Sequence, residues 1–191
     1  MTTRDPIDLG IPIRYHITIR ENEEVFSSIG AFVLAYSEID FILTDMAILL
    51  SRDMRYLSIQ PRFPARFKDK VVFWKKSARV ESEYKGIVSS VFSVIDECGI
   101  ADLDEIRAMW AHSKLTKDQR GGFFTERYHK KSGMIGNNFS HIYTTADFAM
   151  LGRNLIVCDE VVASLRELHN ELFSASKGLV FPDKQIPGYN E

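Results

Sequence analysis

The sequence predicts an all-α fold, a bundle of about five helices with a small β-hairpin or long loop inserted before the last helix. Apolar residues recur at spacings of three and four over most of residues 23–177, as they do on the inner faces of packed helices. One extended pattern, between Gly121-Gly122 and the last helix, interrupts this periodicity. A chain of 191 residues, 45% of them hydrophobic, is long enough for one domain with a substantial core.

Three segments divide the chain. Residues 1–22 form an N-terminal arm, in which alternating isoleucines predict either a short strand or an arm lying against a neighbour. Residues 23–177 form the helical domain. Residues 178–191 form a loosely held tail that contains two of the prolines.

The composition limits the classes of function. A net charge of −2 and a pI near 6.2 exclude a general attraction to nucleic acid, so such binding needs a local basic patch. The two cysteines are too few for a disulfide framework and lack metal-ligand spacing, which predicts reduced thiols in the core. The first residues lack the apolar segment of a signal peptide, and the most apolar stretch, residues 29–50, carries three acidic side chains. We therefore expect a cytoplasmic protein with no membrane span, metal or cofactor.

The strongest pattern predicts a first helix over residues 23–51. Its apolar seam consists of Val25, Ile29, Phe32, Tyr36, Ile39, Leu43, Met46 and Leu50. Glu24, Glu38 and Asp45 share another face and predict a solvent-exposed strip, whereas Asp40 lies off that strip. We interpret Asp40 as a capped or paired residue rather than a functional carboxylate. A helix this long and apolar is either the centre of the bundle or shared with a second subunit.

A basic second helix is predicted to begin at Pro64, because proline suits the first turn of a helix. Between residues 52 and 85 the chain has ten basic and four acidic residues. Such an excess is typical of a solvated helix face, and it also gives this region the strongest local attraction for an RNA or DNA backbone. The residues that we expect to guide RNA here are Arg66, Lys75, Lys76 and Arg79.

The third and last helices have recognisable ends. The third is predicted over residues 82–97, with Gly99 as its C-cap. The last helix is predicted to start at a cap formed by Thr144 or Thr145 and to end near residue 177. Both carry an apolar stripe that faces a common core.

Before the last helix, residues 123–143 interleave basic and aromatic side chains in an extended pattern. Aromatic rings and cations arranged in this way bind single-stranded nucleic acid, the rings by stacking on bases. Arg127 and Lys130 are the expected RNA contacts of this segment. A hairpin with one buried face explains the pattern equally well.

The fourth helix, predicted over residues 101–115, carries Arg107 and His112 in an R-x4-H arrangement. A permanently charged guanidinium and an imidazole that titrates near neutrality suit work on a phosphodiester. A structural explanation competes with this one: Arg107 pairs with Asp104, and His112 completes the helix C-terminus. Five residues place the two side chains about 140° apart around the axis, so a single helix makes a poor site. Two such helices meeting across a two-fold axis bring four groups to one cleft.

The order of these elements, with IRAMWAHS at residues 106–113, resembles the HEPN superfamily of small, mostly dimeric all-α domains. The layout covers residues 23–177, and the motif is IRAMWAHS alone. The resemblance implies a homodimer built on the first and fourth helices. It also implies a metal-independent endoribonuclease, a toxin or defence component whose partners are RNA and an antitoxin or other protein.

In that case Arg107 and His112 are the catalytic residues, His112 as base or acid and Arg107 as the group that holds the phosphate oxygens. The alternative is a non-catalytic helical interaction or RNA-binding module that keeps the fold. Ala108 favours this alternative, because the family usually has a polar residue directly after the arginine.

Overall fold

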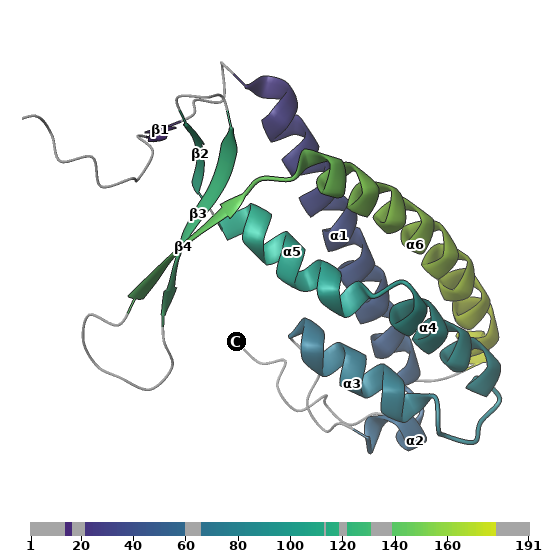
Figure 1. Ribbon diagram of the computed structural model, residues 1–191. Coiled ribbons are helices and arrows are strands. Elements are labelled where there is room, and N and C mark those ends of the chain that lie inside the picture. The colour runs from purple at the N-terminus through teal and green to yellow at the C-terminus, as the bar shows by residue number, and fades with distance from the viewer. Residues whose placement is uncertain are drawn as a thin grey trace, which may run out of the picture.

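The computed structural model describes residues 14–16, 22–59, 66–112, 114–118, 122–130 and 139–178, and it confirms the predicted helical bundle (Figure 1). In chain order, the elements are β1 (Arg14–His16), α1 (Glu23–Leu50), α2 (Met54–Leu57), α3 (Phe67–Ser77), α4 (Lys85–Glu97), α5 (Ile100–His112), β2 (Lys114–Asp118), β3 (Phe123–Lys130), β4 (Phe139–Thr145) and α6 (Phe148–Ala175), which a short 3₁₀ helix (Ser176–Gly178) extends. No helix within these ranges has both the length and the apolar character needed to span a membrane.

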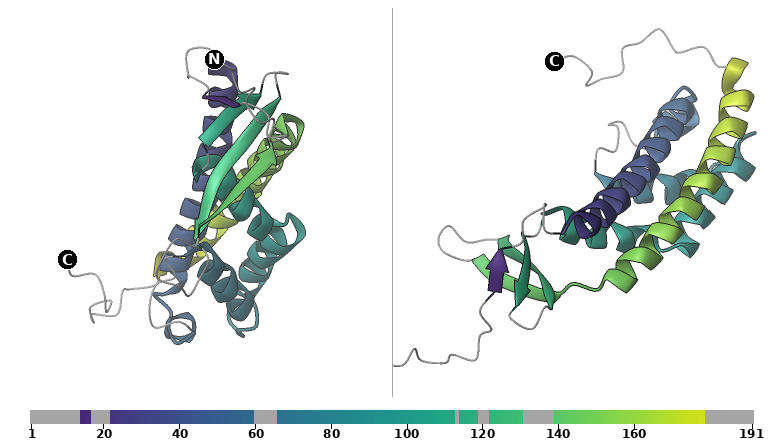
Figure 2. Two further views of the ribbon diagram at one scale, coloured as in Figure 1. Left: turned by 60° about the vertical axis from the view of Figure 1, so that its left-hand side comes forward. Right: turned by 90° about the horizontal axis from the view of Figure 1, so that it is seen from above.

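The two longest helices, α1 and α6, lie side by side and run in the same direction (Figures 1 and 2). Two ion pairs join them: Arg166 donates to Glu38 at 3.0 Å, and His169 Nε2 lies 2.6 Å from an Asp45 carboxylate oxygen. The two carboxylate side chains remain 39% and 44% exposed, as expected for a polar strip, but α6 lies along its edge and supplies a partner to each of them. Periodicity within one helix does not show which neighbour packs beside it.

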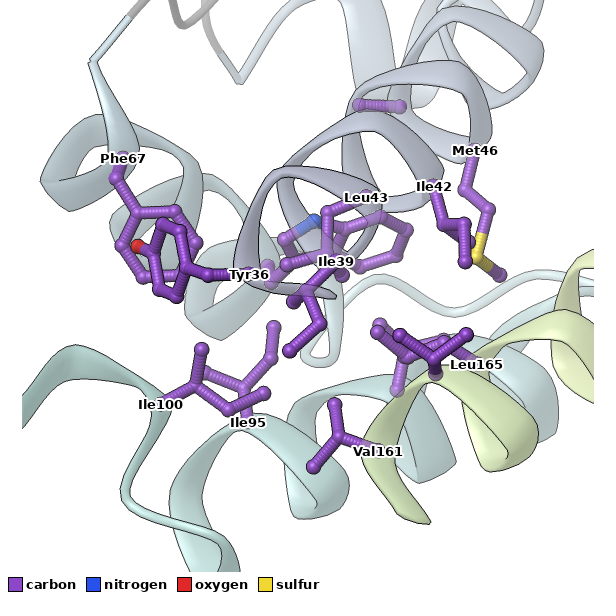
Figure 3. Packing of buried hydrophobic residues seen from close by; sticks show 14 of the residues in the cluster. Tyr36, Ile39, Ile42, Leu43, Met46, Phe67, Ile95, Ile100, Val161 and Leu165 are labelled. Atoms are coloured by element: carbon purple, nitrogen blue, oxygen red, sulfur yellow. The ribbon is translucent and has the colours of Figure 1, made fainter. Parts of the chain in front are cut away.

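The core lies where the apolar seam of α1 meets α3, α4, α5 and α6 (Figure 3). Six of the eight predicted seam residues are buried, and Val25 and Ile29 at the start of the helix are half-buried. Around Ile39 and Leu43 the figure shows side chains from α4, α5 and α6. Each fully buried side chain of leucine size contributes about 2 kcal/mol of transfer free energy, so this seam is the main source of stability.

A four-stranded antiparallel sheet, in the order β1-β2-β3-β4, lies at the end of the bundle where α5 ends and α6 begins (Figure 1). Strands β3 and β4 form the predicted hairpin, and β1 confirms the strand expected in the N-terminal arm. Strand β2 was not expected. The prediction of a helix to residue 115 is wrong, because Leu115 and Thr116 pair with β3 and are buried in strand conformation.

Several helix ends also differ from the predicted ones. The cap of helix α6 lies two or three residues later than predicted, because Thr144 and Thr145 belong to β4 and Asp147 supplies the cap. Its carboxylate accepts from the Met150 N–H at 2.8 Å. Helix α3 begins at Phe67, and Pro64 lies outside the described residues. The predicted C-cap at Gly99 is confirmed by its φ of 60°, a conformation that glycine adopts without strain.

The two cysteines occupy different environments. Cys158 is buried, as predicted, and this burial raises the pKa of its thiol to about 11. The prediction that Cys98 lies in the core is wrong: it is exposed, because the chain leaves α4 there. Both are free thiols in the structure.

One buried ion pair ties α3 to α1. Lys70 is only 3% exposed, and its ammonium donates to Asp40 Oδ1 at 2.6 Å, which confirms that Asp40 is a paired residue. We expect Asp40→Ala to lower the free energy of unfolding by about 3 kcal/mol, because it leaves a buried ammonium without a counter-charge. Lys70→Met should cost less than about 1 kcal/mol, since the Asp40 side chain is 38% exposed and water hydrates it. Urea unfolding of both variants measures the difference, and equal losses would contradict this account.

Candidate functional site

A cavity of about 630 Å³ lies between α1, α3 and α5. Its volume is in the range of cavities that hold small ligands. The side chains that line it come from all three helices: Val33, Tyr36, Ser37, Asp40, Arg66, Phe67, Lys68, Asp69, Asp104 and Arg107. The cavity therefore brings together two predicted site residues, Arg107 and Arg66, whereas His112, Lys75, Lys76 and Arg79 do not line it.

Arg107 is held in the cavity wall by two contacts. Its Nη2 donates to Asp104 Oδ1 at 2.8 Å, one helical turn earlier on α5, which confirms the pair that the spacing suggested. Its guanidinium carbon lies 5.4 Å from the centre of the Tyr36 ring, at cation–π distance. The side chain is 28% exposed, and its Nε is buried with no hydrogen-bond partner in the described part of the chain. The Arg107 side chain thus lines the cavity, while its Nε lies beneath the surface without a hydrogen-bond partner.

Tyr36 places a second donor without a well-formed hydrogen bond at the same wall. The residue is 3% exposed, its ring packs against Phe67 with centres 5.3 Å apart, and its hydroxyl lies near the Asp104 carboxylate but outside normal hydrogen-bond geometry (Figure 3). Burial, together with the negative charge of Asp104, raises the pKa of this hydroxyl well above its ordinary value. The hydroxyl therefore keeps its proton and acts as a donor at every physiological pH.

The remaining charges of the cavity differ in how far they are neutralised. Asp40 is compensated by Lys70, and Lys68 lies 3.8 Å from Glu105 with both side chains exposed. Arg66, which directly precedes α3, is exposed and has no ion-pair partner within the described ranges. Asp69 in the first turn of α3 also lines the cavity, so the lining has three acidic and three basic side chains, and Arg66 supplies the attraction for an incoming anion.

His112 lies outside this cavity. It is exposed at the last position of α5, immediately before the chain turns into β2. About 140° of rotation and roughly 7 Å of helical rise separate it from Arg107, so one chain does not bring the two groups together. Its place in the last turn of α5 agrees with the structural explanation, in which the imidazole faces the carbonyl end of the helix.

The other predicted RNA contacts are dispersed. Lys75 and Lys76 are exposed in the last turn of α3, about 15 Å along the helix axis from Arg66, and Arg79 follows them. Arg127 and Lys130 lie on β3, opposite Ile142 and Phe139 of β4, and their side chains are outside the described part of the structure. Among the described side chains, Lys75, Lys76 and Arg79 therefore do not share the cavity with Arg107.

The two residues that contact Arg107 in the cavity wall, Asp104 and Tyr36, were not predicted as site residues. Asp104 entered the sequence argument only as a partner of Arg107, and Tyr36 only as a core residue. One signal distinguished Tyr36: it carries the only polar atom in the apolar seam of α1, apart from the sulfur of Met46. A buried tyrosine hydroxyl needs a partner, so its position in such a seam indicates a polar site nearby.

Comparisons with protein-family models, with curated proteins and with solved structures find no match for this chain. Among the described residues, no group of three or more histidine, cysteine, aspartate or glutamate side chains is arranged to hold a metal ion. The cavity at Arg107 is consequently the feature from which a function is argued.

Proposed function

We propose that this chain is a HEPN-like, metal-independent endoribonuclease, a toxin or defence component whose complete site forms where two copies meet. The supporting observation is Arg107, a half-buried guanidinium in a cavity wall with an unused donor. A planar guanidinium is well suited to hold phosphate oxygens and to stabilise the charge that grows on them in the transition state.

The proposed reaction needs a base, an acid and this cation. The 2′-hydroxyl of RNA attacks the neighbouring phosphorus, the P–O5′ bond breaks, and a 2′,3′-cyclic phosphate and a 5′-hydroxyl remain. His112 of one copy takes the proton of the 2′-hydroxyl, and His112 of the second copy gives a proton to the leaving oxygen. Because His112 is exposed at the end of α5, it is free to face a second copy.

Helix α1 supplies an apolar surface for such a homodimer. Leu34 and Phe41 are 72% and 64% exposed, seven residues apart and on one face. Ser37, which lines the cavity, lies one turn from each of them on α1. A dimer that packs through Leu34 and Phe41 therefore places the Arg107 cavities of both copies beside one interface. Because α5 forms part of the cavity wall, it lies next to the same interface.

The experiment that tests this function is incubation of the purified protein with mixed single-stranded RNA in the presence of a chelator. We expect cleavage that yields 2′,3′-cyclic phosphate ends, which mass spectrometry of the products identifies. An intact substrate after incubation with the wild-type dimer would overturn the proposed activity.

A second function is favoured by one specific observation. The Arg107 guanidinium already forms an ion pair with Asp104, and the next residue, Ala108, provides no polar side chain. Both features are expected for a non-catalytic interaction or RNA-binding module. The two functions differ in their consequences: a ribonuclease toxin impairs growth when expressed without its antitoxin, whereas a module does not. For a module that binds RNA, we expect affinity that weakens steeply with salt and no cleavage. For a module that binds a partner protein in the cytoplasm, we expect no affinity for RNA even at low salt.

A further inference from the structure

We propose that the cavity between α1, α3 and α5 binds a phosphate group through two buried donors, the Tyr36 hydroxyl and the Arg107 side chain, and that Asp104 competes with this phosphate. The inference rests on the proposed function for the role of Arg107. It adds Tyr36 as a ligand-binding residue and Asp104 as an internal competitor.

The first argument is the pair of unused donors. The Tyr36 hydroxyl and Arg107 Nε both lack a hydrogen bond of normal geometry among the described residues, and both belong to side chains that line the cavity. The acceptor near the hydroxyl is the Asp104 carboxylate, which Arg107 already engages. Nearly all buried donors are paired in native proteins, so two poorly paired donors at one cavity indicate a further acceptor. A phosphate group offers several acceptor oxygens and a negative charge, which matches a neutral hydroxyl beside a guanidinium.

The second argument is how the side chains are fixed. The cation–π contact holds the Arg107 guanidinium over the Tyr36 ring, and Phe67 holds that ring from α3. Both donors are already fixed in position before the ligand binds, so binding loses less side-chain entropy. Arg66, exposed at the rim, adds attraction for an anion without a competing ion pair in the described residues.

The third argument concerns Asp104. Its carboxylate accepts from Arg107 Nη2 at 2.8 Å, and its charge also acts on Tyr36. In the ligand-free protein, the Asp104 carboxylate therefore accepts the hydrogen bond that a phosphate oxygen accepts in the bound state. A second anion entering the cavity is repelled by this carboxylate until the Arg107 pair opens or is shared.

The test is calorimetric titration of the wild-type protein and Tyr36→Phe with three probes: inorganic phosphate, a nucleoside monophosphate and a short single-stranded RNA. We expect Tyr36→Phe to weaken binding of the bound probe at least about fivefold, because it deletes only the hydroxyl and keeps the ring beneath Arg107. Tyr84→Phe is the matched control, since Tyr84 is equally buried but does not line the cavity. Thermal melting of all variants verifies that they are folded.

The outcomes separate this inference from the proposed function. RNA binding that Arg107→Ala weakens and Tyr36→Phe leaves unchanged overturns the inference and leaves the function standing. Binding of the monophosphate or phosphate alone, weakened by Tyr36→Phe, supports the cavity and contradicts RNA as its ligand. If the wild-type protein binds none of the three probes, the inference is overturned.

Asp104→Asn tests the competition directly. This variant keeps the size of the side chain and removes its charge, so we expect the affinity for the bound probe to rise about threefold or more. Unchanged or weakened binding would show that Asp104 orients Arg107 for its ligand, and would overturn its assignment as a competitor.

Discussion

Replacing Arg107 with alanine should lower the rate of the proposed RNA cleavage by at least about 100-fold, which is the effect of removing a main stabiliser of the transition-state charge. His112→Ala should cause a loss of similar size, because general acid–base catalysis contributes about 100-fold or more. Both rates are measured with single-stranded RNA in chelator, under single-turnover conditions. The double variant should be no slower than the slower single variant, since the two groups act in one step.

The control for Arg107 is Arg153→Ala, which removes an exposed arginine from the start of α6, away from the cavity. Its rate should equal that of the wild-type protein. Arg107→Ala also loses the Asp104 pair and the contact with Tyr36, so its melting temperature has to be compared with that of the wild type. Arg107→Lys keeps the charge without the planar fork and should recover only part of the activity. Full activity of a folded Arg107→Ala or His112→Ala would exclude these residues from the catalytic site.

If the proposed homodimer forms, the double substitution Leu34→Glu and Phe41→Glu should convert it to a monomer and abolish the proposed RNA cleavage. Two carboxylates at the centre of an apolar interface are desolvated without partners, so we expect the dimer dissociation constant to rise at least about 100-fold. The monomer should remain folded, because both side chains are largely exposed and support no core contact. Sedimentation or light scattering measures the mass, and the RNA assay measures activity in parallel.

Met54→Glu is the matched control for this prediction. Met54 is 62% exposed, but it lies on the short α2 at the far end of α1 from the sheet (Figure 1). This variant should have the same mass and activity as the wild type. A dimeric and active double variant would contradict the proposed interface on α1, and a monomeric wild-type protein with full activity would contradict a shared site.

Much of the fold follows from patterns that are local in the sequence. The seam of α1 repeats every three or four residues, so periodicity alone located a helix that ends within one residue of its predicted end. Gly99 marked the end of α4 because a left-handed residue favours glycine. The pairing of Asp40 was expected because a carboxylate off the polar strip needs a partner, although the spacing did not identify Lys70.

The features that the sequence did not reveal depend on contacts between distant segments. Strand β2 forms because Leu115 and Thr116 pair with β3. The helical spacing within residues 101–115 does not reveal that β3 is available for this pairing. The ion pairs of α1 with α6 join residues more than 120 positions apart. Cys98 was placed in the core by its apolar neighbours, whereas the position at which the chain leaves α4 exposes it.

For the candidate site, the sequence by itself determined that Arg107 and Asp104 lie one turn apart and that Arg107 and His112 diverge around one helix, because helical geometry fixes both relations. Only the tertiary structure decided what faces Arg107. Packing of α1 against α5 places the Tyr36 ring under the guanidinium and leaves two buried donors at one cavity. The physical reason is that spacing along a helix sets the direction of a side chain, whereas the group that it meets is set by which helices bury their apolar faces against each other.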